Sequence, residues 1–165
     1  MKILIIGHGG HGKDEVANIL ARTHGLWVIP SSVCAFNVIV HELRIALANE
    51  GFFVSSTTEL WNTKFSHREL WRKLIRNYNT PNLDRLTKQI LFEFECDIYI
   101  GMRDADEYEA SKHHFDRILY VDSWPRVERN DPSMKIEFNP KEMFLIDNSG
   151  SLNELENYLT NGFEL

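Results

Sequence analysis

The chain has 165 residues, 43% of them hydrophobic, which is enough for one well-filled core and too few for two ordinary domains. Its formal net charge of −6 gives no general attraction to nucleic acid or to an anionic membrane. The only cysteines, Cys34 and Cys96, lie far apart and form no metal-ligand spacing, so we expect buried free thiols in a reducing compartment. Without a signal-peptide pattern or an apolar run of membrane-spanning length, the sequence predicts a soluble cytoplasmic protein (host cytoplasm if it is viral), a monomer or homodimer.

The first predicted strand, residues 3–6, runs directly into a glycine-rich stretch, Gly7-His8-Gly9-Gly10-His11-Gly12-Lys13-Asp14, which precedes a helical pattern. Glycines let a backbone curl until successive N–H groups face one anion, and the helix N-terminus adds partial positive charge. Lys13 supplies a mobile cation for β- and γ-phosphates. The residues expected to contact the phosphates of ATP are Gly7, Gly9, Gly10, His11, Gly12, Lys13 and Asp14.

The spacing matches the Walker A pattern G-x-x-x-x-G-K-[ST] except at Asp14, where a carboxylate replaces the hydroxyl group that normally contacts magnesium. Asp14 could hold the metal directly or through water. The alternative is an ordinary strand-to-helix turn with Asp14 as an acid favoured by the helix dipole. A dinucleotide fingerprint, G-x-G-x-x-G, is also present, but the acid it requires about twenty residues later is missing from residues 29–36, which favours a mononucleotide triphosphate.

The chain then alternates between helical spacing and short apolar runs. A first helix ends at His24-Gly25, and the apolar residues 26–30 predict a strand closed by a turn at Ser31-Ser32. A second helix is expected over residues 35–49.

Residues 52–95 contain no convincing strand after Phe53-Val54 and predict further helices. Two apolar stripes at helical spacing, over residues 70–78 and 83–94, are separated by a turn at residues 79–82. We interpret this insertion of about 52–95 as an acceptor-binding or lid-like block, or simply as helices packed on the sheet.

Three more strands are predicted over residues 96–102, 118–122 and 144–148. Asp104 caps a helix that runs to about His114, and the capping box Ser151-x-x-Glu154 opens a final helix. A polar, irregular stretch at about 123–135 predicts a lid-like loop, and residues 136–138 could pair briefly.

Predicted strands alternate with helices along the chain, which indicates an α/β fold. Most of these strands are too apolar for one side of the sheet to face water. We expect a mostly parallel sheet with helices on both faces, the three-layer α/β/α architecture of P-loop NTPases, in a single domain over residues 1–165. The carboxyl ends of such strands share one edge, where ligands bind. This edge is expected to carry Gly7–Asp14, Ser31-Ser32, Arg103, Asp122 and Asn148.

The chain resembles the P-loop nucleoside monophosphate kinase superfamily, particularly phage-type deoxynucleoside monophosphate kinases. The matching stretches are Gly12-Lys13-Asp14 with Val16-Ala17, Arg103-Asp104-Ala105-Asp106-Glu107, and Ile146-Asp147-Asn148-Ser149-Gly150 with Leu152 and Leu155. Family members often carry Asp after the loop lysine and an Arg-x-x-x-Glu element at a strand end. Two departures are Gly101, where the family commonly has an acid, and the short chain.

This resemblance implies ATP and Mg²⁺ as cofactors. Lys13 and the loop amides would hold ATP, and Asp14 and Asp122 would organise the metal. Asp122 follows an apolar run like a Walker B acid, although a strand-end turn acid has the same form. Arg126 and Arg129 lie where related kinases have a mobile lid whose arginines close over the phosphates; a solvated loop is the alternative.

Basic residues also suggest where an acceptor would bind. Arg103, at the productive sheet edge, can hold an acceptor phosphate. Arg68 and Arg72 are one helical turn apart, so they could grip an acceptor phosphate or a nucleic-acid backbone, or pair with acids such as Glu69. The aromatic residues Trp61, Trp71 and Tyr78 could stack on a base, although the last two belong to an apolar stripe.

The leading hypothesis is an ATP-dependent kinase acting on a nucleotide, most simply a deoxynucleoside monophosphate, with Lys13, Arg103, Arg126 and Arg129 as catalytic residues. A second hypothesis is a kinase that phosphorylates a hydroxymethylpyrimidine within DNA, with DNA as the alternative substrate. A third is a non-catalytic nucleotide-binding module.

Overall fold

The computed structural model describes residues 1–163 and has the α/β fold that the sequence predicts. Its sheet has four strands, all of them parallel. The strands are β1 (Ile3–Ile6), β2 (Ile98–Ile100), β3 (Arg117–Asp122) and β4 (Phe144–Asp147), in the spatial order β2-β1-β3-β4. Ile5 pairs with Ile100 on one side and with Leu119 on the other. Strand β2 lies on one side of β1, and β3 lies on the other. The strand order therefore reverses direction between β1 and β3, and in parallel sheets ligands bind at such a point.

Seven α-helices accompany the sheet within the described residues. They are α1 (Lys13–His24), α2 (Ser31–Asn49), α3 (Thr57–Ser66), α4 (Arg68–Asn79), α5 (Arg85–Lys88), α6 (Ala105–Ser111) and α7 (Leu152–Asn157). Short 3-10 or π-helical turns follow three of them, at Gln89–Glu93, Lys112–His114 and Tyr158–Gly162. Two predicted caps are confirmed, since Asp104 accepts from two N–H groups of α6 and Ser151 forms a reciprocal capping box with Glu154.

Alternate residues of β1, β2 and β3 face two separate apolar cores, whereas β4 contributes only Ile146. Leu4 and Ile6 pack in one core with residues of α2, α5, α6 and the π-helical turn that follows α5, whereas Ile3 and Ile5 pack in the other with α1 and α7. This alternation is the physical reason for helices on both faces and is compatible with the predicted three-layer arrangement.

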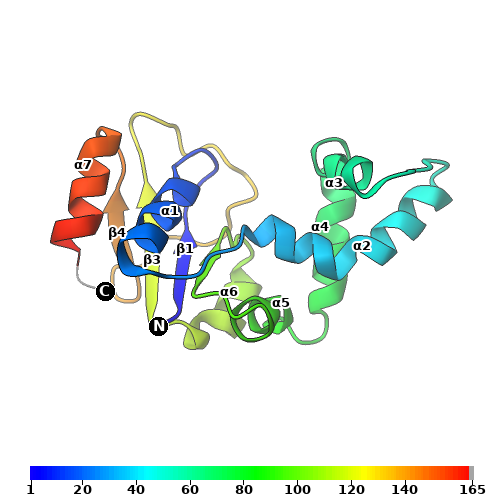
Figure 1. Cartoon of the computed structure of the whole chain (residues 1–165), viewed down its shortest axis with the longest axis horizontal. Coiled ribbons are helices and arrows are strands. Elements are labelled where there is room, and N and C mark those ends of the chain that lie inside the picture. The colour runs from blue at the N-terminus through cyan, green and yellow to red at the C-terminus, as the bar shows by residue number, and fades with distance from the viewer. Residues whose placement is uncertain (164–165) are drawn as a thin grey trace.

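Helices α3 and α4, together with the second half of α2, form a block that projects from the sheet (Figure 1). The block has an apolar core of its own, composed of Phe36, Ile39, Leu43, Leu47, Leu60 and Trp71. Four of these six core residues belong to α2, which precedes the predicted insertion at about 52–95. The helices of the insertion therefore do not form this core without α2.

Three predictions about secondary structure are wrong, and one helix was not predicted. Residues 26–30 form only an isolated bridge between Val28 and Ile98, because Pro30 cannot donate to a ladder and the next helix begins at once. Ser31-Ser32 is the first turn of α2, since the fixed φ of the preceding proline suits a helix start. Residues 136–138 form no strand, and helix α3 was missed.

The sequence analysis also expected no apolar run of membrane-spanning length, yet α2 is long and apolar enough to cross a membrane by length and composition. Its apolar side chains contribute to packing in two places. Cys34 and Ala35 join the sheet core, and residues further along α2 form the core of the helical block. This packing buries 33% of the most apolar window of α2.

Candidate functional site

The glycine-rich loop, residues 7–12, connects β1 to α1 at the β1–β3 boundary. At two positions of the loop, both the backbone conformation and the lack of room for a side chain require glycine. A Cβ at Gly7 (φ +144°) would overlap the carbonyl oxygen of Val121, and a Cβ at Gly12 (φ +85°) would overlap the side-chain amide of Asn148. The loop is thus packed tightly against the ends of β3 and β4.

The ring of His11 is fully buried and holds this loop in place. Its Nδ1 accepts a hydrogen bond from the Ser123 N–H at 3.0 Å, which leaves Nε2 to donate to the carbonyl oxygen of Glu128 at 3.3 Å. Asn148 Nδ2 donates to the carbonyl oxygen of His11 at 2.9 Å. Both nitrogens of the His11 ring are therefore engaged by the protein, so the ring has a supporting position, and a phosphate contact from His11 would come from its backbone N–H.

Lys13 lies at the first position of α1 with its side chain largely buried. Its Nζ donates to the carbonyl oxygen of His8 at 2.6 Å. Burial, and then the nearby charge of Arg103, lower the pKa of Lys13 to about 8. The side chain remains a cation at neutral pH, held against the loop where an anion would approach.

A carboxylate already occupies the loop. The Gly9 N–H donates to Asp131 Oδ2 at 3.1 Å, and Arg103 Nη1 donates to the same oxygen at 2.6 Å. Burial alone would raise the pKa of Asp131, but hydrogen bonds from Ser133 and the charge of Arg103 lower it below the usual value. Asp131 thus places a negative charge where the loop would receive a phosphate oxygen.

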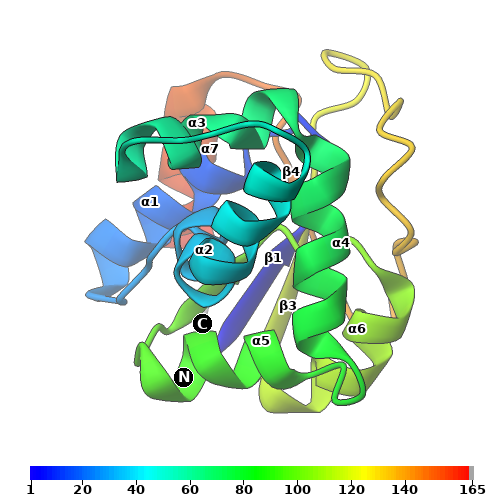
Figure 2. The same cartoon turned by 90° about the vertical axis from the view of Figure 1, so that its right-hand side faces the viewer.

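A cavity of about 1170 Å³ opens beside this loop and is called the main cavity below. It lies between the loop, the carboxyl end of β2, the start of α6, and helix α4. Figure 2 shows α4 and α6 next to each other on the side of the sheet away from α1. The cationic residues that line the main cavity are Lys13, Arg72, Lys73, Arg76, Arg103 and Lys135.

Helix α4 contributes arginines to the main cavity, though not the pair that the sequence analysis selected. Arg72 lines it and pairs with Glu69 at 2.5 Å, whereas Arg68 lies outside the lining. Arg76, which the sequence analysis missed, also lines it and pairs with Asp104 at 2.9 Å. The signal was available, because Arg76 follows Arg72 at the same four-residue spacing.

An acid and a phenol face the main cavity together. The Tyr99 hydroxyl donates to Glu107 Oε1 at 3.0 Å. Burial raises the pKa of Glu107 to about 7, an effect that the charge of Asp104 reinforces and hydrogen bonds from Tyr99 and Asn79 oppose. The sequence analysis did not assign Glu107 to the site.

This acid should make folding stability depend on pH. Between pH 4.5 and about 7 the folded protein keeps the Glu107 proton while the unfolded chain has released it, so stability falls as pH rises through this interval. Glu107→Gln is expected to remove this contribution, which is at most about 3 kcal/mol. Urea unfolding at several pH values would measure it, with the exposed Glu109→Gln as control. The same pH dependence in wild type and Glu107→Gln would contradict the expectation.

The two arginines of the predicted lid-like loop do not line the main cavity. Arg126 Nη2 donates to the carbonyl oxygen of Asn148 at 2.7 Å, and Arg129 pairs with Asp122. The Arg129 hydrogen bond lowers the pKa of Asp122. Of the two predicted magnesium ligands, Asp14 is exposed and lines the main cavity, whereas Asp122 is engaged by Arg129 and lies 3.2 Å from His11 Nδ1.

The aromatic residues proposed for base stacking also lie outside the main cavity. Trp71 is buried in the helical block, where its Nε1 donates to Thr63 Oγ1 at 3.0 Å. Trp61 packs on Phe36, and the Tyr78 hydroxyl donates to Gln89. The sequence analysis favoured core positions for Trp71 and Tyr78; Trp71 is fully buried, and Tyr78 is partly buried against the sheet core.

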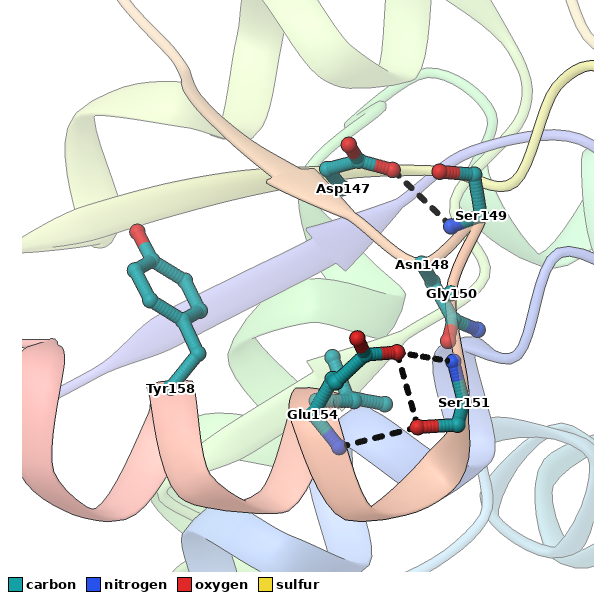
Figure 3. A pocket seen from close by; sticks show the side chains of 8 residues that line it. Asp147, Asn148, Ser149, Gly150, Ser151, Glu154 and Tyr158 are labelled. Atoms are coloured by element: carbon teal, nitrogen blue, oxygen red, sulfur yellow. Dashed lines mark hydrogen bonds between the residues drawn. The ribbon is translucent and has the colours of Figure 1, made fainter.

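Two other features bring polar groups together. A smaller cavity of about 350 Å³ lies beside β4 and α7, and its polar groups bond mainly to one another (Figure 3). Asp84, His113 and His114 are grouped closely enough for a metal, but Asp84 Oδ2 is already bonded by His114 at 2.9 Å and by Lys88 at 2.7 Å. Neither feature shows a group that requires a ligand.

Comparison with models of protein families and with curated proteins found no match to this chain.

Proposed function

We propose that the protein is a P-loop kinase that transfers the γ-phosphoryl group of ATP to a nucleotide, most simply a deoxynucleoside monophosphate. One observation carries the proposal: the glycine-rich loop with Lys13, the strand-end Arg103 and the arginines of α4 all line a single cavity of about 1170 Å³. This volume exceeds the roughly 300–1,000 Å³ typical of a site for one small ligand, and so it suits two.

Phosphoryl transfer requires positioning of two substrates and positive charge around the group in transit. The loop N–H groups and Lys13 would hold the phosphates of ATP. Arg103 and Arg72 would hold the acceptor phosphate, and Arg76 extends the same face of α4. Each of these cations lines the main cavity, which gives the two substrates a common space.

Magnesium would neutralise charge on the ATP phosphates, as in other phosphoryl transfers. Asp14 fits this ion, because its carboxylate is exposed in the main cavity next to Lys13. Asp122 could contribute only if its pairing with Arg129 were broken. The same rearrangement would free Arg129 to approach the phosphates, as the resemblance to nucleotide kinases implies.

The proposal is tested by ADP release from Mg·ATP across a panel of acceptors, with Lys13→Ala as control. The panel contains the common deoxynucleoside and ribonucleoside monophosphates, unmodified DNA and DNA with hydroxymethylpyrimidines. We expect a Lys13-dependent signal with at least one free monophosphate. A signal only with DNA would support the DNA kinase instead, and ATP binding without any acceptor-dependent signal would support a non-catalytic module.

A further inference from the structure

One acid of the main cavity has no task in phosphoryl transfer. Glu107 lies in the first turn of α6, beside the cations that would hold phosphate, yet within the described part of the chain it forms no ion pair. The neighbouring arginines are engaged elsewhere, since Arg76 pairs with Asp104 and Arg103 pairs with Asp131. Glu107 is thus a partly buried carboxyl group that faces a ligand cavity without a cationic partner.

Neutral neighbours fix the orientation of this carboxyl group. Tyr99 donates to Oε1 at 3.0 Å from β2. The Asn79 side chain accepts from the Leu86 N–H at 2.9 Å through Oδ1, which leaves its NH₂ group for Glu107. A carboxylate has about four acceptor sites on its two oxygens, and Tyr99 and Asn79 use two of them, so Glu107 keeps acceptor sites for a ligand.

The surroundings suit a flat, largely apolar group with polar edges. Apolar side chains from several elements line the same cavity as Glu107, namely Ala35, Ile75, Leu83, Leu86 and Met102. A nucleotide base has apolar faces and a hydrogen-bonding edge. At pH 8, where the binding test below is run, Glu107 is mostly ionised because its pKa is about 7. An ionised carboxylate only accepts hydrogen bonds, so it selects an edge that presents donors.

We propose that Glu107 reads the base of the acceptor nucleotide and selects guanine, an inference that rests on the proposed function. Guanine presents its ring N1–H and its amino group side by side, which a carboxylate accepts through two parallel hydrogen bonds. Adenine and cytosine place a ring-nitrogen acceptor beside their amino group. Thymine and uracil place carbonyl oxygens on both sides of one N–H, and these repel a carboxylate.

The test is equilibrium binding of dGMP, dAMP, dCMP and dTMP to the full chain without ATP, measured by calorimetry at pH 8. Wild type should bind dGMP most tightly. Glu107→Gln, which replaces an acceptor oxygen with an amide donor, should weaken dGMP binding about ten- to a hundredfold and leave the other three nearly unchanged. Glu109→Gln, an exposed change two residues further along α6 and outside the main cavity, should alter none of them.

A second variant separates base reading from damage to the fold. Tyr99→Phe keeps the ring and removes the hydrogen bond that orients Glu107, so a loss of dGMP affinity of about three- to fivefold is expected. Equal binding of all four monophosphates by wild type, or an equal loss of all four in Glu107→Gln, would overturn the inference.

These outcomes are distinguishable from those of the kinase proposal. Glu107-dependent binding of dGMP without phosphoryl transfer would support base reading and contradict the kinase. Transfer at equal rates to every monophosphate would support the kinase and contradict base reading.

Discussion

Replacement of Lys13 by alanine is expected to lower the rate of phosphoryl transfer by about 10²- to 10³-fold, the usual cost of losing one preorganised charge at a developing anion. Lys13 is the only cation at the start of α1, and its Nζ lies 2.6 Å from the carbonyl oxygen of His8 within the loop. A steady-state assay of ADP release at saturating acceptor would measure the loss.

The fold should survive this substitution. Burial lowers the pKa of Lys13 to about 8, which means that the folded protein holds this charge at a cost in free energy. The melting temperature of Lys13→Ala is therefore expected to equal or exceed that of the wild type. Lys141→Ala removes an exposed lysine outside the main cavity and should leave both transfer and stability unchanged. Full transfer activity in folded Lys13→Ala would refute the assigned role.

Asp131→Asn is expected to tighten binding of ATP and of inorganic triphosphate by about tenfold. In the structure the Asp131 carboxylate accepts from the Gly9 N–H and from Arg103, two groups that an incoming phosphate would use. Removal of its charge weakens this competition, and a tenfold change corresponds to about 1.4 kcal/mol. Calorimetric titration of both ligands would measure the change.

Asparagine is the informative substitution because it preserves the local turn. The Ser133 N–H donates to Asp131 Oδ1 at 3.0 Å, and an asparagine oxygen can accept the same bond. Glu128→Gln removes one exposed negative charge from the same segment without altering a side-chain contact to the loop, so it controls for net charge. Weaker triphosphate binding by Asp131→Asn than by Glu128→Gln would show that Asp131 assists the ligand instead of competing with it.

The parts of the fold that depend on local residues could be predicted from the sequence. The strand, glycine-rich loop and helix at residues 3–24 follow from apolar spacing and from glycine conformations, and the caps at Asp104 and Ser151 follow from hydrogen bonds over three residues. Helix α3 could have been predicted in the same way, because Ser56 precedes Glu59 by the three residues typical of a capping pair. In the structure the Ser56 hydroxyl oxygen accepts from the Glu59 N–H.

The candidate site depends on contacts that no local pattern encodes. Asp131 reaches the Gly9 N–H across 122 residues of chain, and the polar segment that contains it has no periodicity from which this contact could be inferred. Glu107 occupies a position typical of a helix-capping acid, but its side chain turns toward Tyr99 on the neighbouring strand. Packing between elements decided both positions.

The most direct test of the central claim follows the phosphoryl group itself. Wild-type protein is mixed with ATP labelled at the γ-phosphate, Mg²⁺ and dGMP, and the labelled products are separated. The account predicts that the label appears in dGDP and that Lys13→Ala lowers the rate of this transfer by about 10²- to 10³-fold. Label that stays in ATP, or that appears only as inorganic phosphate with every monophosphate tried, would contradict the claim that the glycine-rich loop and the arginines of the main cavity form one phosphotransferase site.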